Sequence, residues 1–286
     1  MRAFQTDLER AITSVGFMLA VVGIVVALMA GGFTGLWVDM EVVKKEGLEF
    51  GYHWQMLKRG LQSEAFTFAL PILCTLGFGG VYLEEMKSGY YKFALPRYGR
   101  RNYVLTKVII SVLSGGLAMW LGVMLTALIY WTVYAPMEIN MELAALSGRV
   151  SDVMYAATGA AKDVAGFYVD VTVQDALHSN MFLLLLQWSA IAFLMGGTWA
   201  GVSCFFAVLY GNRYMAYGAS FLISYLLIIL LTRFFNGIYI FNPREWFNQT
   251  CYWEGGNLGV MALLTECMLI LMLVNGILME RKLAPA

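Results

Sequence analysis

The chain of 286 residues is 60% hydrophobic and only 13% charged, and its mean hydropathy is +0.67. Soluble domains are about 45–50% apolar and about 25% charged, so the composition indicates an integral membrane protein. The formal net charge of +0 gives no reason to expect a nucleic-acid partner. The 4 cysteines and 2 histidines follow no disulfide or metal-ligand spacing. We therefore expect no metal and no cofactor bound by this chain.

A helix needs about 20 mostly apolar residues to cross a bilayer. The apolar stretches between charged residues predict six such helices, and no repeat or linker divides them, so we expect one transmembrane domain over residues 1–286. The first stretch exceeds the roughly 7–15 apolar residues of a signal-peptide core, which predicts that it is retained. The predicted spans cover residues 11–37, 65–83, 108–134, 181–210, 214–232 and 257–279.

The orientation follows from the basic residues. An even number of spans places both ends of the chain on one side of the membrane. The densest basic cluster lies between the second and third spans, and both ends are also basic. Because cytoplasmic loops carry an excess of Lys and Arg, we expect a cell-membrane protein with both termini in the cytoplasm.

Two predicted outer connections have distinctive compositions. Residues 136–180 form a long acidic connection, whose alanine-rich part at 144–165 could be helical. Residues 234–256 are rich in aromatic side chains, which favour the level of the lipid headgroups. The second connection is therefore a possible re-entrant segment at the outer interface.

The connection from Leu83 to Lys107 predicts an amphipathic elbow on the cytoplasmic side. It begins with the acidic pair Glu84 and Glu85, continues through apolar and aromatic residues, and ends in a basic cluster after Pro96. Considered on physical grounds alone, such a segment fixes the topology and contacts lipid headgroups.

The order of residues in this elbow resembles that in the permeases of type-2 ABC exporters. The residues that carry the resemblance are Glu84, Glu85, Gly89, Pro96, Arg100, Arg101, Tyr103 and Lys107. The resemblance implies six spans with both termini inside, and a coupling helix seated in a cleft of a separate ABC ATPase subunit. That subunit would bind ATP and Mg, and a second permease copy or homologue would complete a dimer.

The same resemblance assigns candidate contacts with the ATPase. The first set lies in the elbow and comprises Glu84, Glu85, Lys87, Gly89, Pro96, Arg97, Arg100 and Arg101. A second, smaller contact falls on Asn212 and Arg213 in the short connection between the fourth and fifth spans. The long acidic connection is not a general feature of the family.

Catalytic motifs are absent from the sequence. It contains no G-x-x-x-x-G-K-[ST] phosphate loop, no G-x-S-x-G and no H-E-x-x-H. We therefore expect no enzyme in this chain and place the ATPase activity in a partner subunit. The expected function is outward movement of an amphipathic substrate, a peptide or a lipid-like molecule.

Glu266 is the one carboxylate in an otherwise apolar predicted span. A charge at this depth costs roughly 2.5–3.5 kcal/mol. Glu266 therefore either lines a translocation path or joins a proton relay, or it is structural and is protonated or hydrogen-bonded to a neighbouring helix. Two other functions stay open. A secondary transporter driven by an ion gradient would use Pro71, Gln187 and Glu266, and a membrane immunity or binding protein would need no transport path.

Overall fold

The computed structural model describes residues 2–38, 52–76, 79–134, 181–235, 239–242, 246 and 256–283. Almost all of these residues are helical. Five of the helices are long and apolar enough to cross a membrane. The prediction of an all-α membrane protein is therefore confirmed at this level.

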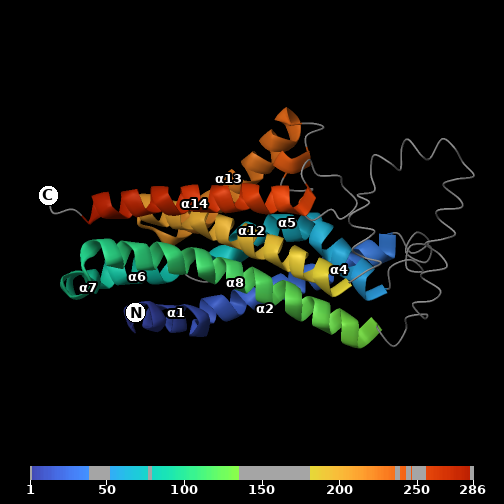
Figure 1. Cartoon of the computed structure of the whole chain (residues 1–286), viewed down its shortest axis with the longest axis horizontal. Helices are drawn as coiled ribbons and strands as arrows, with labels where there is room; N and C mark the ends of the chain where they lie inside the picture. Colours follow the sequence, from blue (N-terminus) through green and yellow to red (C-terminus); the bar gives the residue numbers. More distant parts are fainter. Residues whose placement is uncertain are drawn as a thin grey trace, which may run out of the picture.

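The described helices follow one another in the order shown in Figure 1. Short helices precede or interrupt the long ones, and the 3-10 turn η2 lies before the last helix. The elements are α1 Arg2–Thr13, α2 Val15–Val38, α4 Tyr52–Gln62, α5 Glu64–Leu76, α6 Gly79–Ser88, α7 Tyr91–Tyr98, α8 Arg100–Tyr134, α12 Met181–Tyr210, α13 Arg213–Phe234, η2 Tyr239–Phe241 and α14 Gly256–Lys282.

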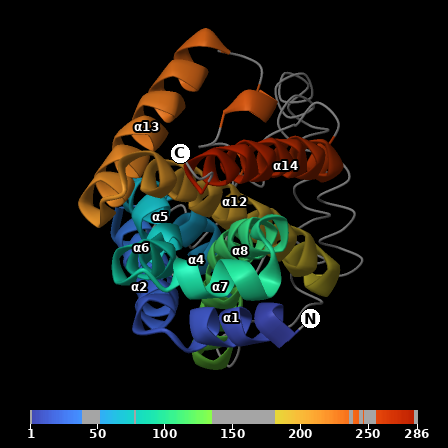
Figure 2. The ribbon, with the colours of Figure 1, turned by 90° about the vertical axis from the view of Figure 1, so that its left-hand side faces the viewer.

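Helix α12 lies at the centre of the bundle and packs against α8, α14, α13 and α5 (Figure 2). It meets α8 most closely at a pair of glycines. A Cβ atom added to Gly196 would lie 2.6 Å from the backbone oxygen of Gly115. The absence of side chains at these two positions is therefore what allows the two backbones to touch.

The first predicted span, 11–37, is divided into two helices at Ser14. The Ser14 hydroxyl accepts a hydrogen bond from the Phe17 backbone N–H at 3.1 Å, which caps the start of α2. Residues 11–13 belong to the preceding helix α1, which is amphipathic and packs against α8. The apolar span itself therefore begins after Ser14.

The second predicted span, 65–83, contains parts of two described helices. Helix α5 ends at Leu76 and α6 begins at Gly79, and the apolar part of α5 is shorter than the five long helices. Helices α4 and α5 are separated only by Ser63, and together they pack antiparallel to α2. Gly60 lies against Leu28, and Leu76 lies against Gly16 near the start of α2.

The remaining spans lie close to their predicted positions. Helix α12 has the predicted bounds, and α13 and α14 extend the predicted spans by three residues or fewer at each end. Helix α8 begins at Arg100, well before the predicted residue 108, and is 35 residues long.

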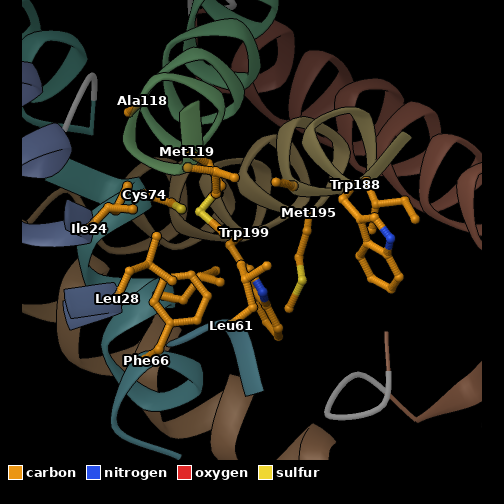
Figure 3. Close-up of a cluster of buried hydrophobic side chains, with 14 of the residues drawn as sticks. Ile24, Leu28, Leu61, Phe66, Cys74, Ala118, Met119, Trp188, Met195 and Trp199 are labelled. Carbon is orange, nitrogen blue, oxygen red and sulfur yellow. The ribbon is translucent and has the colours of Figure 1, made fainter. Parts of the chain in front are cut away.

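The main core joins α2, α4, α5, α8 and α12. Figure 3 shows Ile24, Leu28, Phe66, Met119 and Trp199 turned toward one another from these helices. Trp188 and Met195 continue the same cluster along α12. Burial of these large side chains stabilises the centre of the bundle.

The acidic connection, 136–180, lies outside the described residues, and so does most of the aromatic segment 234–256. Its described part contains η2 and Trp246, which is 8% exposed and packs in the main core. The Trp246 indole N–H donates a hydrogen bond to the Ile240 carbonyl at 2.7 Å.

Candidate functional site

A second buried cluster marks one end of the bundle, which we call the elbow end. It brings together α6, α7, the first turns of α8, the last turns of α12 and α14, and the start of α13. In Figure 1 this is the left end, where α6, α7 and the end of α14 lie. The elbow end therefore collects segments from almost the whole chain around α7.

Two glycines allow the chain to turn on either side of α7. Gly89 has φ 72° and Gly99 has φ 73°, values that L side chains rarely adopt. The Gly99 N–H donates to the Leu95 carbonyl at 3.0 Å and closes the last turn of α7. The next helix, α8, begins immediately afterwards at Arg100. Helix α7 is thus a separate short helix with a sharp turn at each end.

The two faces of α7 differ in character. Ala94 is buried in the second cluster, and Tyr91 and Leu95 pack partly against it. Phe93 points away from the bundle and is 76% exposed, and Arg97 is also exposed. One face therefore anchors α7, while the other presents an aromatic ring beside basic groups.

A buried charge cluster lies behind the elbow. Lys107 of α8 is 1% exposed, and its Nζ donates to Glu85 Oε1 of α6 at 2.7 Å and to Asp7 Oδ2 of α1 at 2.8 Å. The Tyr103 hydroxyl donates to the other oxygen, Glu85 Oε2, at 2.8 Å. The Lys107 ammonium also lies 5.4 Å from the centre of the Tyr103 ring. Four side chains from three helices thus form one connected network.

The network contains two carboxylates and one ammonium. The Glu85 side chain is 9% exposed, and both of its oxygens are hydrogen-bonded within the bundle. Asp7 is the more accessible acid, with its side chain 16% exposed. A buried charged group is costly unless it is paired and hydrogen-bonded, and Lys107 and Glu85 each meet that requirement through the other.

The elbow residues predicted from the sequence occupy three environments. Glu85 is buried, and Gly89 and Arg100 are partly buried. The Arg100 Nε atom is buried and has no hydrogen-bond partner among the described residues. The exposed members of the set are Glu84, Lys87, Pro96, Arg97 and Arg101.

The second predicted contact also lies at the elbow end. Asn212 is exposed and caps α13, because its side-chain oxygen accepts from the Tyr214 N–H at 3.1 Å. Arg213 is the first residue of α13. Lys282, at the end of α14, donates to the carbonyls of Val208 and Leu209 in the last turn of α12. The connection between α12 and α13 is thus tied to the end of α14.

Glu266 lies far from these residues, in the N-terminal half of α14, and its side chain is exposed. The structure therefore does not bring it together with the elbow set. Among the described residues, no group of His, Cys, Asp and Glu side chains has the arrangement of a metal site.

Sequence reasoning missed the role of Asp7. It is separated from Lys107 by 100 residues, so no motif or helical spacing connects the two. The available signal was Lys107 itself, because a lysine within a membrane helix commonly pairs with an acidic side chain or with backbone carbonyls.

Comparison with known proteins gives no relative from which a function could be transferred. The chain matches no protein-family model, no curated protein and no solved structure.

Proposed function

We propose that this chain is the permease subunit of an ABC exporter, with α7 as the coupling helix that docks into a separate ATPase subunit. ATP and Mg would be bound by that subunit. The permease would move an amphipathic substrate, a peptide or a lipid-like molecule, out of the cytoplasm. The single observation that carries the proposal is the elbow helix with one anchored face and one exposed aromatic and basic face.

The proposed topology has six crossings in the cell membrane, with both termini in the cytoplasm. The five long helices supply five of them, and α4 with α5 supplies the sixth. Together these two helices accompany α2 along most of its length, from Met56 beside Gly32 to Leu76 beside Gly16. At 1.5 Å per residue, the stretch 52–76 is roughly 37 Å long, which is enough to cross the hydrocarbon core.

The exposed face of α7 suits a protein partner. Phe93 offers an apolar group for a pocket, and Lys92 and Arg97 flank it with positive charge. Interfaces draw most of their affinity from a few buried aromatic and arginine side chains.

Glu85 has a different role in this proposal from the one expected from the sequence. Both of its oxygens are bonded inside the bundle, so it would transmit movement rather than touch the ATPase. Through Lys107 it connects α6 with α8 and α1. A displacement of α7 would therefore move α6 and α8, the helices that precede and follow it, together.

The test uses the full-length chain, co-expressed with an ATPase encoded by an adjacent reading frame and purified in nanodiscs. Phe93→Ala and Arg97→Glu change the exposed face of α7 without touching its anchored face. Arg281→Glu is the matched control, because it reverses the charge of an exposed basic side chain at the end of α14. We expect the two α7 variants to lose most of the ATPase from the purified complex and the control to retain it.

An equal loss in the Arg281→Glu control would contradict docking through α7, because net charge alone would then explain binding. If no ATPase associates with the wild-type chain, the exporter assignment fails. Transport driven by an ion gradient then becomes the function to test.

A further inference from the structure

The last turns of α14 are bonded to the last turns of α12, and the two helices lie side by side (Figures 1 and 2). Asn275 donates to the Gly201 carbonyl, and Lys282 donates to the Val208 carbonyl. Each bond joins residues that are 74 apart in the sequence. Because this separation is constant, the two helices run parallel here, and the two bonds together fix the position of α14 along α12.

Lys282 completes the end of α12. The last four carbonyls of an α-helix have no partner within the helix. Gly211, with φ 65°, ends the helix, and its N–H donates to the Ala207 carbonyl at 3.0 Å. The Lys282 ammonium donates to the next two carbonyls, those of Val208 and Leu209, the second at 2.8 Å. Its positive charge is also favoured there by the helix dipole.

Buried neighbours hold the backbone of Lys282 in place. Met279 is 0% exposed and Leu283 is 8% exposed, and both belong to the second buried cluster. The same cluster contains Ala94 of α7 and Ala216 near the start of α13. The end of α14 therefore contacts the anchored face of α7 through its apolar side chains and the end of α12 through Lys282.

The turn that follows the capped end of α12 is exposed. Asn212 is exposed and its side-chain oxygen is occupied in capping α13. Tyr214, two residues later, is 84% exposed, and Tyr210 before the turn is also exposed. Tyrosine is one of the side chains that most often supply the affinity of protein interfaces. The group that this turn offers to a partner is therefore an aromatic ring beside a capped helix start.

We infer that Lys282 is a positioning residue for the docking of the ATPase, an inference that rests on the proposed function for the identity of the partner. By capping α12, Lys282 holds the turn at Asn212 and so places Tyr214 for the second contact. The same residue ties this turn to the end of α14, which packs in the cluster beneath α7. The two contacts with the ATPase are thereby kept in a constant relation to each other.

The first measurement uses the full-length chain alone, in nanodiscs, and follows amide hydrogen exchange over residues 207–212. Lys282→Met keeps the length of the side chain but removes its donors, and it should fold because Lys282 is exposed. Exchange in this segment should become about tenfold faster or more, which corresponds to the loss of a charged hydrogen bond. Lys282→Arg keeps a charged donor and should exchange slowly. Arg281→Met, which removes the same charge one residue earlier, is the matched control.

The second measurement is the Kd of the ATPase from the adjacent reading frame, titrated onto the same nanodiscs. Lys282→Met should raise the Kd by about tenfold. Lys282→Arg and Arg281→Met should stay near the wild-type value. The double variant of Lys282→Met with Tyr214→Ala should bind hardly more weakly than Tyr214→Ala alone, because Lys282 acts through the turn. Additive losses would mean that Lys282 contacts the ATPase by itself.

The inference is overturned by wild-type exchange rates or a wild-type Kd in Lys282→Met, by additive losses in the double variant, or by equal effects of Arg281→Met. An unchanged Kd in Lys282→Met, with the ATPase still bound, overturns the positioning role alone and leaves docking through α7 intact. Failure of the wild-type chain to bind the ATPase overturns the proposed function together with this role. The two failures are therefore distinguished by the wild-type titration.

Discussion

Lys107 of α8 and Glu85 of α6 lie 2.7 Å apart, and both are almost completely buried. The two residues belong to the helices on either side of α7, so their ion pair closes the elbow at its base. Asp7 brings the first helix into the same contact at 2.8 Å. The elbow is therefore held by charge as well as by the apolar cluster around Ala94.

Removing the cation from this network should destabilise the protein strongly. Lys107→Met retains the length of the side chain but leaves Glu85 and Asp7 without their ammonium partner. Breaking one side of a buried ion pair costs about 3–5 kcal/mol. The measurement is the free energy of unfolding by SDS in mixed micelles.

A double-mutant cycle provides the control for this prediction. Once Lys107 is methionine, adding Glu85→Gln should cost far less than it does in the wild-type protein, because the charge it removes is already unpaired. Additive losses in the double variant would show that the two residues do not interact energetically.

The glycine contact between α8 and α12 predicts a second stability effect. Gly196→Ala would place a Cβ atom 2.6 Å from both the Gly115 oxygen and the Met119 Cβ atom. A backbone oxygen cannot swing aside, so the helices must separate and lose packing, and overpacking of this kind typically costs about 1–3 kcal/mol.

Gly218→Ala is the matched control for Gly196→Ala, since nothing lies within 4 Å of a Cβ added at Gly218 in α13. Alanine is the better helix former by about 1 kcal/mol, so the control should be neutral or slightly stabilised. The same SDS titration compares the two variants, and equal losses would argue against close packing as the cause.

The fold was predictable where apolar runs are bounded by polar residues. Helix α12 begins and ends as predicted, and α13 starts directly after Asn212, which caps it. The second span stays a prediction, and hydropathy does not reveal α4, the helix that precedes it. That helix carries Lys58 and Arg59, yet Met56 and Leu57 are buried in the main core. Tertiary packing, rather than local hydropathy, makes it part of the bundle.

The sequence predicted where in the chain the candidate site lies, but not which of its side chains are buried. The order of glycine, proline and basic residues predicted a cytoplasmic elbow between Leu83 and Lys107. The short helix α7 lies within that segment, and its role as an elbow stays a prediction. The separation of its members into exposed and buried could not be predicted, because Glu84 and Glu85 differ only in the side of α6 on which they lie. The partner Asp7 is contributed from 100 residues away, which no local pattern indicates.

Gly99 should be essential for the direction of α7. Its φ of 73° requires glycine, and a Cβ atom there would meet nothing within 4 Å. Any effect of Gly99→Ala is therefore conformational strain, about 1–3 kcal/mol, without steric overlap. We expect faster amide hydrogen exchange across residues 91–98, measured in nanodiscs, and unchanged exchange in α12. Unchanged exchange in α7 would show that the helix does not depend on this turn.

Asn275 tests how much a buried hydrogen bond contributes inside the bundle. Its Nδ2 donates to the Gly201 carbonyl at 2.9 Å, while its Oδ1 has no partner among the described residues. Asn275→Leu loses the hydrogen bond but also removes an unsatisfied carbonyl. Hydrogen bonds between membrane helices average about 0.6 kcal/mol, so this variant should lie within about 1 kcal/mol of wild type in SDS unfolding.

Asn275→Asp is the informative comparison with Asn275→Leu, because the aspartate side chain has almost the same shape as the asparagine that it replaces. It replaces the donor with a second acceptor facing the Gly201 carbonyl and buries a carboxyl group with no cation near it. Desolvation of such a group costs several kcal/mol or forces its protonation. We therefore expect Asn275→Asp to be far less stable at neutral pH than Asn275→Leu, with part of the loss recovered at acidic pH as the carboxyl group takes up a proton. Equal stability of the two variants at neutral pH would mean that water reaches residue 275, and that the contact between α12 and α14 is more open than its burial indicates.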